Sequence, residues 1–327
     1  MRRFFFRVFV LLVLAIAGLL AYGLFLPVGP ETQELVQLKP GSPARRIAAD
    51  LASAGVIRSQ TAFLLWHYAH GRSLKAGEYS FDHPAGLREV YDRIARGDIY
   101  FHTVVIPEGF SMFDIAAAME QSGLGRRDDF LKIARTETAL VRDLDPAAPT
   151  LEGYLFPDTY HFTRTQSLKD MAATMVRRFR QTAAELPLNQ GMHDVVTMAS
   201  LVEKETGVND ERPVVAGVFR NRLNRRIPLA TDPAVIYAAM LNNRWRGTIY
   251  QSDLQFNSPY NTYRNAGLPP GPICNPGKQS LLAALHPAST EYLYFVSDNQ
   301  GHHRFARTLA EHGANVAAYR RAVGQGH

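Results

Sequence analysis

The chain has 327 residues, too many for one ordinary domain, so two or three folded units are expected. Hydrophobic residues make up 46% of it, which excludes a disordered chain, and 36 basic against 30 acidic residues leave a net charge of only +6. No run of Lys and Arg is long enough to indicate nucleic-acid binding. The single cysteine, Cys274, excludes an intrachain disulfide, and its proline-rich surroundings contain no nearby histidine that would favour a nucleophile.

The first 27 residues predict an uncleaved membrane anchor. Residues 8–26 carry no charge and are about long enough to cross a hydrocarbon core of roughly 30 Å. Basic residues precede this stretch, which places the N-terminus in the cytoplasm and the rest of the chain outside it. A cleaved signal peptide is the alternative, but no small-x-small site follows the apolar stretch, although Ala15-Ile16-Ala17 occurs within it. Membrane lipid of the inner (cytoplasmic) membrane is therefore an expected partner.

A small α/β region is predicted for residues 28–150. Glycine and N-cap signals bound its elements, with strands at 35–38, 75–81 and 101–106, helices at 44–54, 60–70, 87–95 and 112–121, and a charged helical segment at 126–146. Its aromatic residues suit either sugar stacking or, more commonly, a core; they are Trp66, Tyr68, Tyr79 and Phe81. No catalytic constellation stands out, so a binding or spacer role is expected.

A second region is predicted for residues 151–327. Residues 151–160 suit either a packed strand and turn or a cleft wall in which Glu152 or Asp158 holds polar ligand groups. Periodicity predicts helices at 168–185, 214–223, 234–241 and from about Ala314, and strands at 292–296 and 303–305 joined by a hairpin turn.

Residues 197–207 end an apolar helix with two carboxylates and a glycine. Val195, Met198 and Leu201 lie at helical spacing, and Glu205 continues their face. Burial on such a face raises a carboxyl pKa, and a raised pKa lets the acid donate a proton near neutral pH. Glu203 points about 200° away and follows an adjoining stripe, so it is the weaker candidate. A solvated helix end is the alternative to any catalytic role.

Two later stretches suit the surroundings of this acid. Asp232 is either the N-cap of the following helix or a residue that orients a partner near the acid. The long loop at 257–273 contains Tyr260, Asn261 and Tyr263, which suit sugar binding, although it could equally be a plain connection.

No metal or other cofactor is expected. The histidines near the C-terminus, His302, His303 and His312, have neither an H-x-x-x-H spacing nor a cysteine partner. These histidines are better explained as residues of a surface strand and of a helix cap.

Several stretches, in this order, closely resemble the endolytic murein transglycosylases of the MltG (YceG-like) family. They are the apolar N-terminus, LEGYLFPDTY, ASLVEKETG followed by ER, PLATDPAVIY, SPYNTYRNAGLPPGPI and YLYFVSDNQGHHRF. The resemblance runs from about residue 35 to residue 320. It implies an α+β protein with a transmembrane anchor (1–27), a small LysM-like α/β region (28–150) and a lysozyme-related, mixed α+β lytic transglycosylase domain (151–327). The family usually has Gln at position 230, so Ala230 leaves open what that position contacts.

The family's catalytic glutamate matches Glu205, and Glu205-Thr206 looks like the Glu-Ser step of other lytic transglycosylases. The resemblance implies that this acid cleaves the MurNAc–GlcNAc bond of nascent peptidoglycan strands, leaves a 1,6-anhydro-MurNAc end and so terminates elongation. The supporting or substrate-binding candidates are Glu203, Glu152, Asp232, Tyr260, Asn261 and Tyr263. Expected partners are glycan strands, with peptidoglycan synthases as further candidates. A hydrolytic muramidase and a non-catalytic peptidoglycan-binding scaffold are the alternatives.

Overall fold

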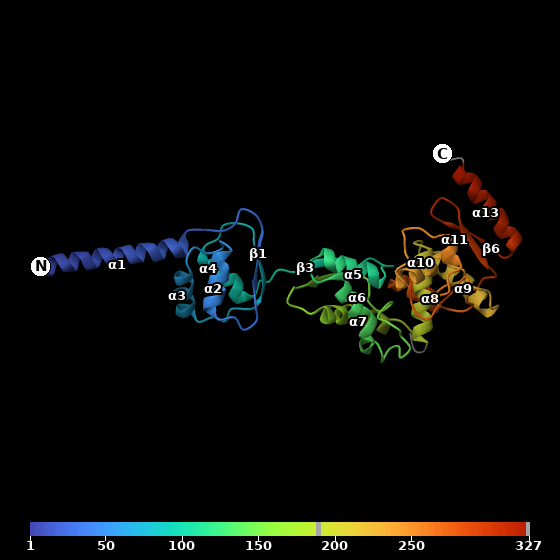
Figure 1. Ribbon diagram of the computed structural model, residues 1–327, viewed down its shortest axis with the longest axis horizontal. Coiled ribbons are helices and arrows are strands. Elements are labelled where there is room, and N and C mark those ends of the chain that lie inside the picture. Colours follow the sequence, from blue (N-terminus) through green and yellow to red (C-terminus); the bar gives the residue numbers. More distant parts are fainter. Residues whose placement is uncertain (188–190, 325–327) are drawn as a thin grey trace. The chain divides into compact units, whose positions relative to one another are not determined.

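The computed structural model describes residues 1–187 and 191–324 (Figure 1). The chain divides into two compact units, of which the first comprises residues 1–102 and 161–166 and the second residues 103–160 and 167–327. Both units combine helices with short strands, which confirms the expected α+β class. The boundary predicted near residue 150 lies inside the second unit, and the division into LysM-like and lysozyme-related domains stays a prediction.

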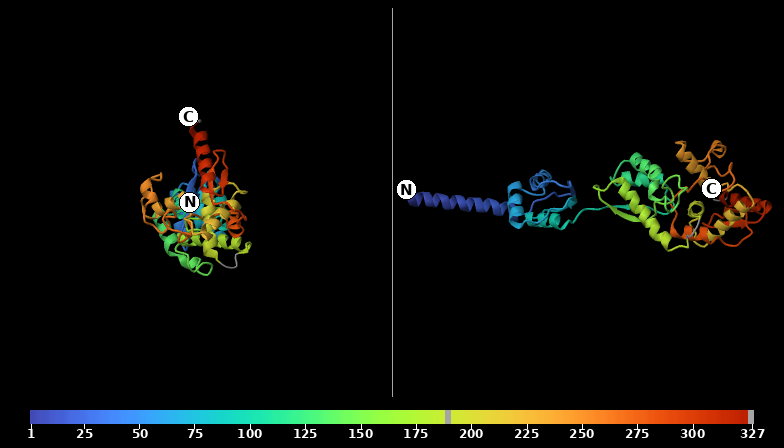
Figure 2. Two further views of the ribbon diagram at one scale, coloured as in Figure 1. Left: turned by 90° about the vertical axis from the view of Figure 1, so that its right-hand side faces the viewer. Right: turned by 90° about the horizontal axis from the view of Figure 1, so that it is seen from below.

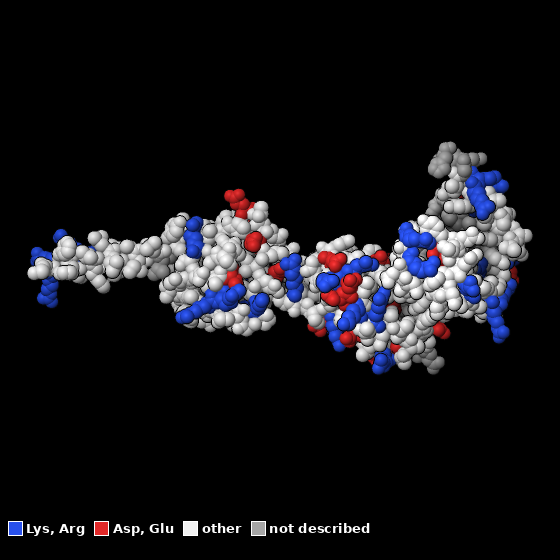
Figure 3. Space-filling view, viewed as in Figure 1, with Lys and Arg blue, Asp and Glu red and all other residues white. Residues whose placement is uncertain are grey.

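Helix α1 (Arg2–Phe25) is long and apolar enough to cross a membrane. Its most apolar window has a mean hydropathy of 2.7 and is 6% buried, so its hydrophobic side chains face outward. At about 1.5 Å per residue, such a helix is about as long as a hydrocarbon core is thick. Figure 3 shows basic residues at its N-terminal tip and an uncharged surface along the remainder. A signal sequence near the N-terminus meets the same criteria.

The core of the first unit lies between a two-stranded sheet and three helices. Its elements are β1 (Glu34–Leu38), α2 (Ala44–Ser53), α3 (Gln60–His70), β2 (Gly77–Phe81) and α4 (Leu87–Arg96). The strands are antiparallel, with Glu34 opposite Phe81 and Leu38 opposite Gly77. Gly71 follows α3 in the left-handed conformation, with φ of 60°, which is the helix-ending role that its position predicts.

The four aromatic residues considered for sugar stacking belong mostly to this core. Tyr79 and Phe81 are buried, and Trp66 packs against the core while partly exposed. Tyr68 alone is largely exposed. The core interpretation therefore accounts for three of the four.

The second unit begins with a helical subregion. Its helices are α5 (Met112–Gln121), α6 (Arg127–Thr136), the 3₁₀ helix η1 (Thr138–Leu140) and α7 (Leu168–Ala184). Strands β3 (His102–Val105) and β4 (Thr159–Phe162) each contain residues of both units. The predicted helix at 126–146 is correct only as far as Thr136. Beyond η1 the chain turns around Asp145, whose buried carboxylate accepts hydrogen bonds from Tyr154 Oη (2.5 Å) and Ala147 N (2.9 Å).

The rest of the second unit surrounds helix α8. The elements are α8 (Met192–Glu205), α9 (Arg212–Asn224), α10 (Asp232–Leu241), α11 (Gln251–Leu254), α12 (Lys278–Leu285), β5 (Tyr294–Ser297), β6 (His303–Ala306) and α13 (Leu309–Gly324). Helix α8 packs against α9, α10 and α12, and α13 packs against the β5–β6 hairpin (Figures 1 and 2). In that hairpin Tyr294 lies opposite Ala306 and Ser297 lies opposite His303.

The structure corrects the predicted start of the last helix. Helix α13 begins at Leu309 rather than at about Ala314. Thr308 Oγ1 accepts a hydrogen bond from Glu311 N, and Glu311 accepts one in return from Thr308 N. This reciprocal capping starts the helix one turn earlier than hydrophobic periodicity indicates.

Candidate active site

Helix α8 carries Glu205 as its last residue. The helix is buried without a break from Val196 to Val202, so its end is held firmly in the core. Thr206 leaves the helix in an extended conformation, with φ of −141° and ψ of 134°. Gly207, which was expected to end the helix, does not adopt the left-handed conformation.

Glu205 lines a cleft of about 470 Å³ within the second unit. The cleft walls come from α8, α9, the start of α10, the 257–273 loop, β5 and α13. The polar and aromatic residues that line it are Glu205, Arg222, Thr231, Asp232, Tyr263, Tyr294, Phe295 and His312. An apolar and aromatic lining with a few polar groups is typical of ligand-binding sites.

The carboxyl group of Glu205 is adapted to hold a proton. Burial first, and then the carboxylate of Asp232, raise its pKa from 4.5 to about 7 against the opposing charge of Arg222. Within residues 1–187 and 191–324 the carboxyl makes no hydrogen bond and no ion pair. An acid of this kind donates a proton near neutral pH and takes it back later.

Asp232 faces the same cleft and is held by Tyr263. The Tyr263 hydroxyl donates a hydrogen bond of 2.7 Å to Asp232 Oδ1. The expected N-cap role of Asp232 is wrong, because Thr231 is the N-cap of α10 and Asp232 is its first residue. Thr231 is tied to the loop through its amide, which donates to Thr262 Oγ1 at 3.0 Å. The two predicted residues Asp232 and Tyr263 are therefore brought to Glu205.

Arg222 is a cleft residue that sequence reasoning missed. Its guanidinium donates to the carbonyl oxygens of Leu293 (2.6 Å) and Leu229 (2.8 Å) and lies over the ring of Tyr294, 5.2 Å from its centre. Burial lowers the pKa of Arg222. The group thus joins α9 to β5 and places a positive charge where a carboxylate forms. Nothing in its arginine-rich segment distinguishes it from its neighbours in the sequence.

His312 and Tyr294 form a second part of the wall that sequence reasoning missed. Their rings stack with centres 5.1 Å apart and planes inclined by 21°. His312 Nδ1 is buried and has no hydrogen-bond partner among the described residues. Burial lowers the pKa of His312. The imidazole of His312 therefore contributes a flat, uncharged ring to the cleft wall.

Glu203 faces away from the cleft and makes structural contacts. Its carboxylate pairs with Arg212 at 3.1 Å and accepts a hydrogen bond of 2.9 Å from Gly277 N. The side chain is 6% exposed. Glu203 therefore links α8 to the first residue of α9 and to the N-terminus of α12.

Glu152 is buried outside the residues that line the cleft. Its oxygens accept hydrogen bonds from Met112 N (2.9 and 3.0 Å), at the start of α5, and from Asn275 Nδ2 (2.7 Å). Burial raises the pKa of Glu152 to about 8. These contacts cap α5 and hold the chain segment around Asn275 in place. The structure does not bring Glu152 to Glu205.

Tyr260 and Asn261 hold the long loop together. Asn261 is fully buried, and its amide donates to the carbonyl oxygens of Asp253, Leu254 and Phe256 at 2.8 to 3.3 Å. Tyr260 packs against Tyr237 with ring centres 5.2 Å apart. Neither lines the cleft, so of the three predicted loop residues only Tyr263 reaches it.

The remaining reactive side chains form no further centre in the part of the chain that the structure describes. No group of three His, Cys, Asp or Glu residues is arranged for a metal there. His303 Nδ1 lies 2.7 Å from Glu211 Oε2, and His302 is near the same carboxylate. Cys274 is buried and donates to Ser200 O at 3.3 Å, and burial raises its thiol pKa.

The chain is similar in sequence to known proteins. An endolytic murein transglycosylase of Bacillus subtilis is 33% identical, and the alignment covers 94% of this chain and 91% of that protein. One from Streptococcus pneumoniae is 29% identical over 90% of this chain, but the alignment spans only 60% of the pneumococcal protein.

Structural and family comparisons agree with these relatives. A crystal structure of a YceG-like protein from Listeria monocytogenes matches 87% of this chain and 99% of that chain, with a TM-score of 0.57 and 31% identity. A model of the YceG-like family matches residues 36–318, which include every residue of the cleft described above. The chain belongs to the YceG-like family.

Proposed function

We propose that the chain is a membrane-anchored peptidoglycan lytic transglycosylase in which Glu205 is the single catalytic acid and base. Relatives named endolytic murein transglycosylase support the reaction class. The observation that carries the residue assignment is the Glu205 carboxyl, which lines the cleft with a pKa near 7 and without a fixed partner.

In the first step the protonated Glu205 donates its proton to the oxygen between MurNAc and GlcNAc. The bond from MurNAc C1 to that oxygen breaks, GlcNAc leaves as an alcohol, and positive charge develops at C1 and the ring oxygen. Glu205 becomes a carboxylate. Arg222 is placed to stabilise the negative charge of this carboxylate, because its guanidinium already favours the ionised form of Glu205.

In the second step the Glu205 carboxylate removes the proton of the MurNAc C6 hydroxyl. The C6 oxygen attacks C1 and closes the 1,6-anhydro ring, and Glu205 regains its proton. No water is consumed. The attacking hydroxyl belongs to the sugar itself, and this proximity lowers the entropic cost of the step. A second free carboxylate is therefore unnecessary, and Asp232 serves to raise the pKa of Glu205 and to hold Tyr263.

Two other functions make different predictions. A hydrolytic muramidase would use Asp232 to activate water and would leave a reducing MurNAc end. A non-catalytic scaffold would bind strands without cutting them. Mass spectrometry of fragments from purified, uncross-linked strands separates the three. We expect anhydro ends, lighter than reducing ends by one water, and reducing ends or intact strands would contradict the proposal.

The finer parts of the proposal concern placement and biological role. The apolar helix α1, preceded by Arg2 and Arg3, would hold the protein in the inner membrane with its N-terminus in the cytoplasm. The cleft would then act outside the cytoplasm on nascent strands, in a lysozyme-related domain that follows a LysM-like region. Cuts within nascent strands would end their elongation, beside the peptidoglycan synthases that make them.

A further inference from the structure

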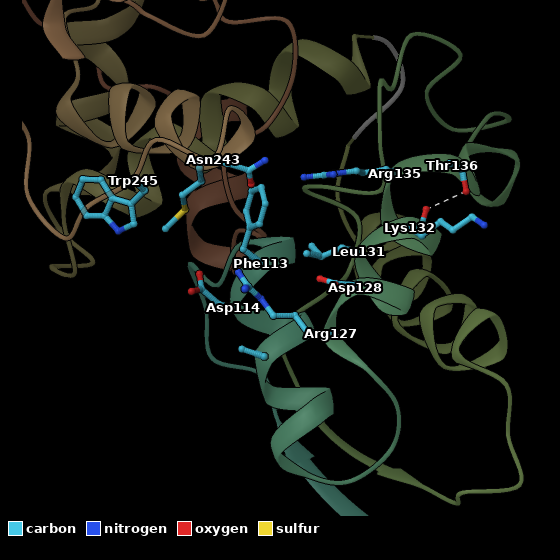
Figure 4. A pocket seen from close by; sticks show the side chains of 12 residues that line it. Phe113, Asp114, Arg127, Asp128, Leu131, Lys132, Arg135, Thr136, Asn243 and Trp245 are labelled. Atoms are coloured by element: carbon cyan, nitrogen blue, oxygen red, sulfur yellow. Dashed lines mark hydrogen bonds between the residues drawn. The ribbon is translucent and has the colours of Figure 1, made fainter. Parts of the chain in front are cut away.

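A second, larger cleft of about 750 Å³ lies in the same unit, between α5, α6 and the segment after α10 (Figure 4). Its floor is apolar, with Phe113, Leu131 and Met240. Trp245 and Asn243 stand on the α10 side of the cleft in Figure 4. A partly exposed indole beside an amide is a combination that suits a sugar ring, because the ring stacks and the amide both donates and accepts hydrogen bonds.

A further cavity adjoins the large cleft along one face of α10. A smaller cavity of about 230 Å³ shares Asp114 and Met240 with the large cleft. The same cavity is lined by Lys204 and Pro233, the sequence neighbours of Glu205 and Asp232. Pro233, Ile236 and Met240 recur at helical spacing, so they mark a single exposed face of α10. The large cleft and this cavity form a groove along α10, and residues at its near end are the sequence neighbours of Glu205 and Asp232.

The length of this groove fits a polymer rather than a single sugar. Asp232 and Met240 lie about 12 Å apart along the axis of α10, at about 1.5 Å per residue. The large cleft extends beyond Met240 to Trp245. A strand that reaches from the Glu205 cleft along α10 to Trp245 would therefore span several sugar rings on one side of the bond that Glu205 cleaves.

Helix α6 supplies the charge of the large cleft. Arg127, Leu131 and Arg135 follow one another at intervals of four, so one face of α6 presents two guanidinium groups beside an apolar contact. Figure 4 shows both arginines directed into the cleft, and the Arg135 guanidinium lies 5.6 Å from the centre of the Phe113 ring. Among the described residues neither makes an ion pair.

The two acids of the large cleft offset only part of its positive charge. Asp114 accepts hydrogen bonds from the amide (2.9 Å) and hydroxyl (2.7 Å) of Ser111 in the cap of α5. Asp128 lies in the first turn of α6, where the helix dipole favours an acid. Lys132 adds a third cation to the lining. With these three cations against the carboxylates of Asp114 and Asp128, the lining keeps a net charge of +1, which a neutral glycan would not use.

We propose that this groove binds a peptide-bearing stretch of the glycan strand, with Arg127 and Arg135 pairing with the carboxylates of its peptide stem. The inference rests on the proposed function and deepens it. The sugars contribute neutral rings to the groove and the stems of uncross-linked peptidoglycan contribute free carboxylates, so both halves of the ligand have a matching surface. The enzyme would then cut peptide-bearing strands in preference to stripped ones.

The test compares two substrates made from one preparation of uncross-linked strands, one intact and one stripped of its stems by an amidase. The double variant Arg127→Gln/Arg135→Gln is measured in the full-length protein. We expect kcat/KM on intact strands to fall about tenfold, since two exposed charge pairs are lost, and kcat/KM on stripped strands to stay within about twofold of wild type. The wild-type preference for intact strands should also weaken as salt is raised.

The matched control is Arg142→Gln/Arg320→Gln, which removes two exposed arginines of the same unit that line neither cleft. It should keep the preference for intact strands. An equal loss on both substrates, or no loss on either, would overturn the peptide-stem inference while leaving the reaction intact. If the wild-type protein cuts neither substrate, the proposed function itself fails.

Discussion

Glu203 and Glu205 are two residues apart and have opposite surroundings. Helix geometry turns their side chains about 200° from one another, so one carboxylate is paired with Arg212 while the other faces the cleft. A desolvated carboxyl without a partner takes up a proton more readily than one in water. The same helix end thus supplies a structural contact and the proposed acid.

The pH dependence of cleavage should report the proton on Glu205. Its pKa is raised to about 7, so the protonated form needed for the first step is lost as pH rises through that value and kcat/KM should fall. Asp232→Asn removes a negative charge that raises this pKa. The fall should therefore begin at lower pH in the variant, whereas exposed Asp129→Asn should leave it in place. A pH–rate profile unchanged by Asp232→Asn would contradict the assignment.

Glu203 should matter for stability. Glu203→Ala leaves buried Arg212 with one remaining carboxylate, that of the half-exposed Glu108 at 3.8 Å. Breaking a buried pair in this way should lower the free energy of unfolding by about 3 kcal/mol. Thermal denaturation of the full-length protein in detergent measures the change, and Glu205→Gln serves as the comparison because its carboxyl has no partner to lose. A melting temperature equal to that of wild type would show that the ion pair is dispensable.

Only part of the site could be predicted from the sequence. The position of Glu205 in the cleft was predictable because its helical phase relative to the preceding apolar residues is a local signal, although α8 proves to be buried on every side from Val196 to Val202. Arg222, Tyr294 and His312 were not, because α9, β5 and α13 meet only in the tertiary structure. Asn261 has the composition of a sugar ligand, yet its amide satisfies backbone carbonyls of its own loop. Residue type alone does not distinguish these two uses of an asparagine.

At the scale of elements, the ends of helix α3 match the capping signals in the sequence. Helix α3 begins after Ser59 and ends before Gly71 as predicted, because a side-chain cap and a left-handed glycine mark its two ends. Helix α12 was not predicted, because it has only eight residues and its N-cap, Gly277, offers no side-chain hydrogen bond. Its position is set by packing against α8 and α9.

Two helical glycines should respond in opposite ways to alanine. A Cβ on Gly217 of α9 would lie 2.6 Å from the carbonyl oxygen of Ala288, whereas one on Gly313 of α13 would meet open space. Gly217→Ala should therefore destabilise the protein by about 2 kcal/mol, since the clash is with backbone. Gly313→Ala should stabilise it by up to about 1 kcal/mol through helix propensity. Thermal melting of both variants measures this, and a stabilising Gly217→Ala would show that α9 is free to move from the 288 segment.

For the whole molecule, the proposed anchor makes a separate prediction. Full-length protein should remain with membranes after alkaline extraction, whereas a chain that begins at residue 28 should be released into the supernatant. The reason is that α1 is the only helix among the described residues that is long and apolar enough to span the bilayer. An N-terminal sequence of the membrane-bound protein that begins beyond Phe25 would identify a cleaved signal instead.

The most direct test of the central claim is the product spectrum of wild-type protein and Glu205→Gln on uncross-linked strands. We expect anhydromuramyl ends from wild type and a loss of about 10²-fold or more in the variant, with the two melting temperatures similar. Glu203→Gln should retain the same products. A Glu205→Gln protein that cuts as fast as wild type, or an inactive but folded Glu203→Gln beside an active Glu205→Gln, would contradict the account.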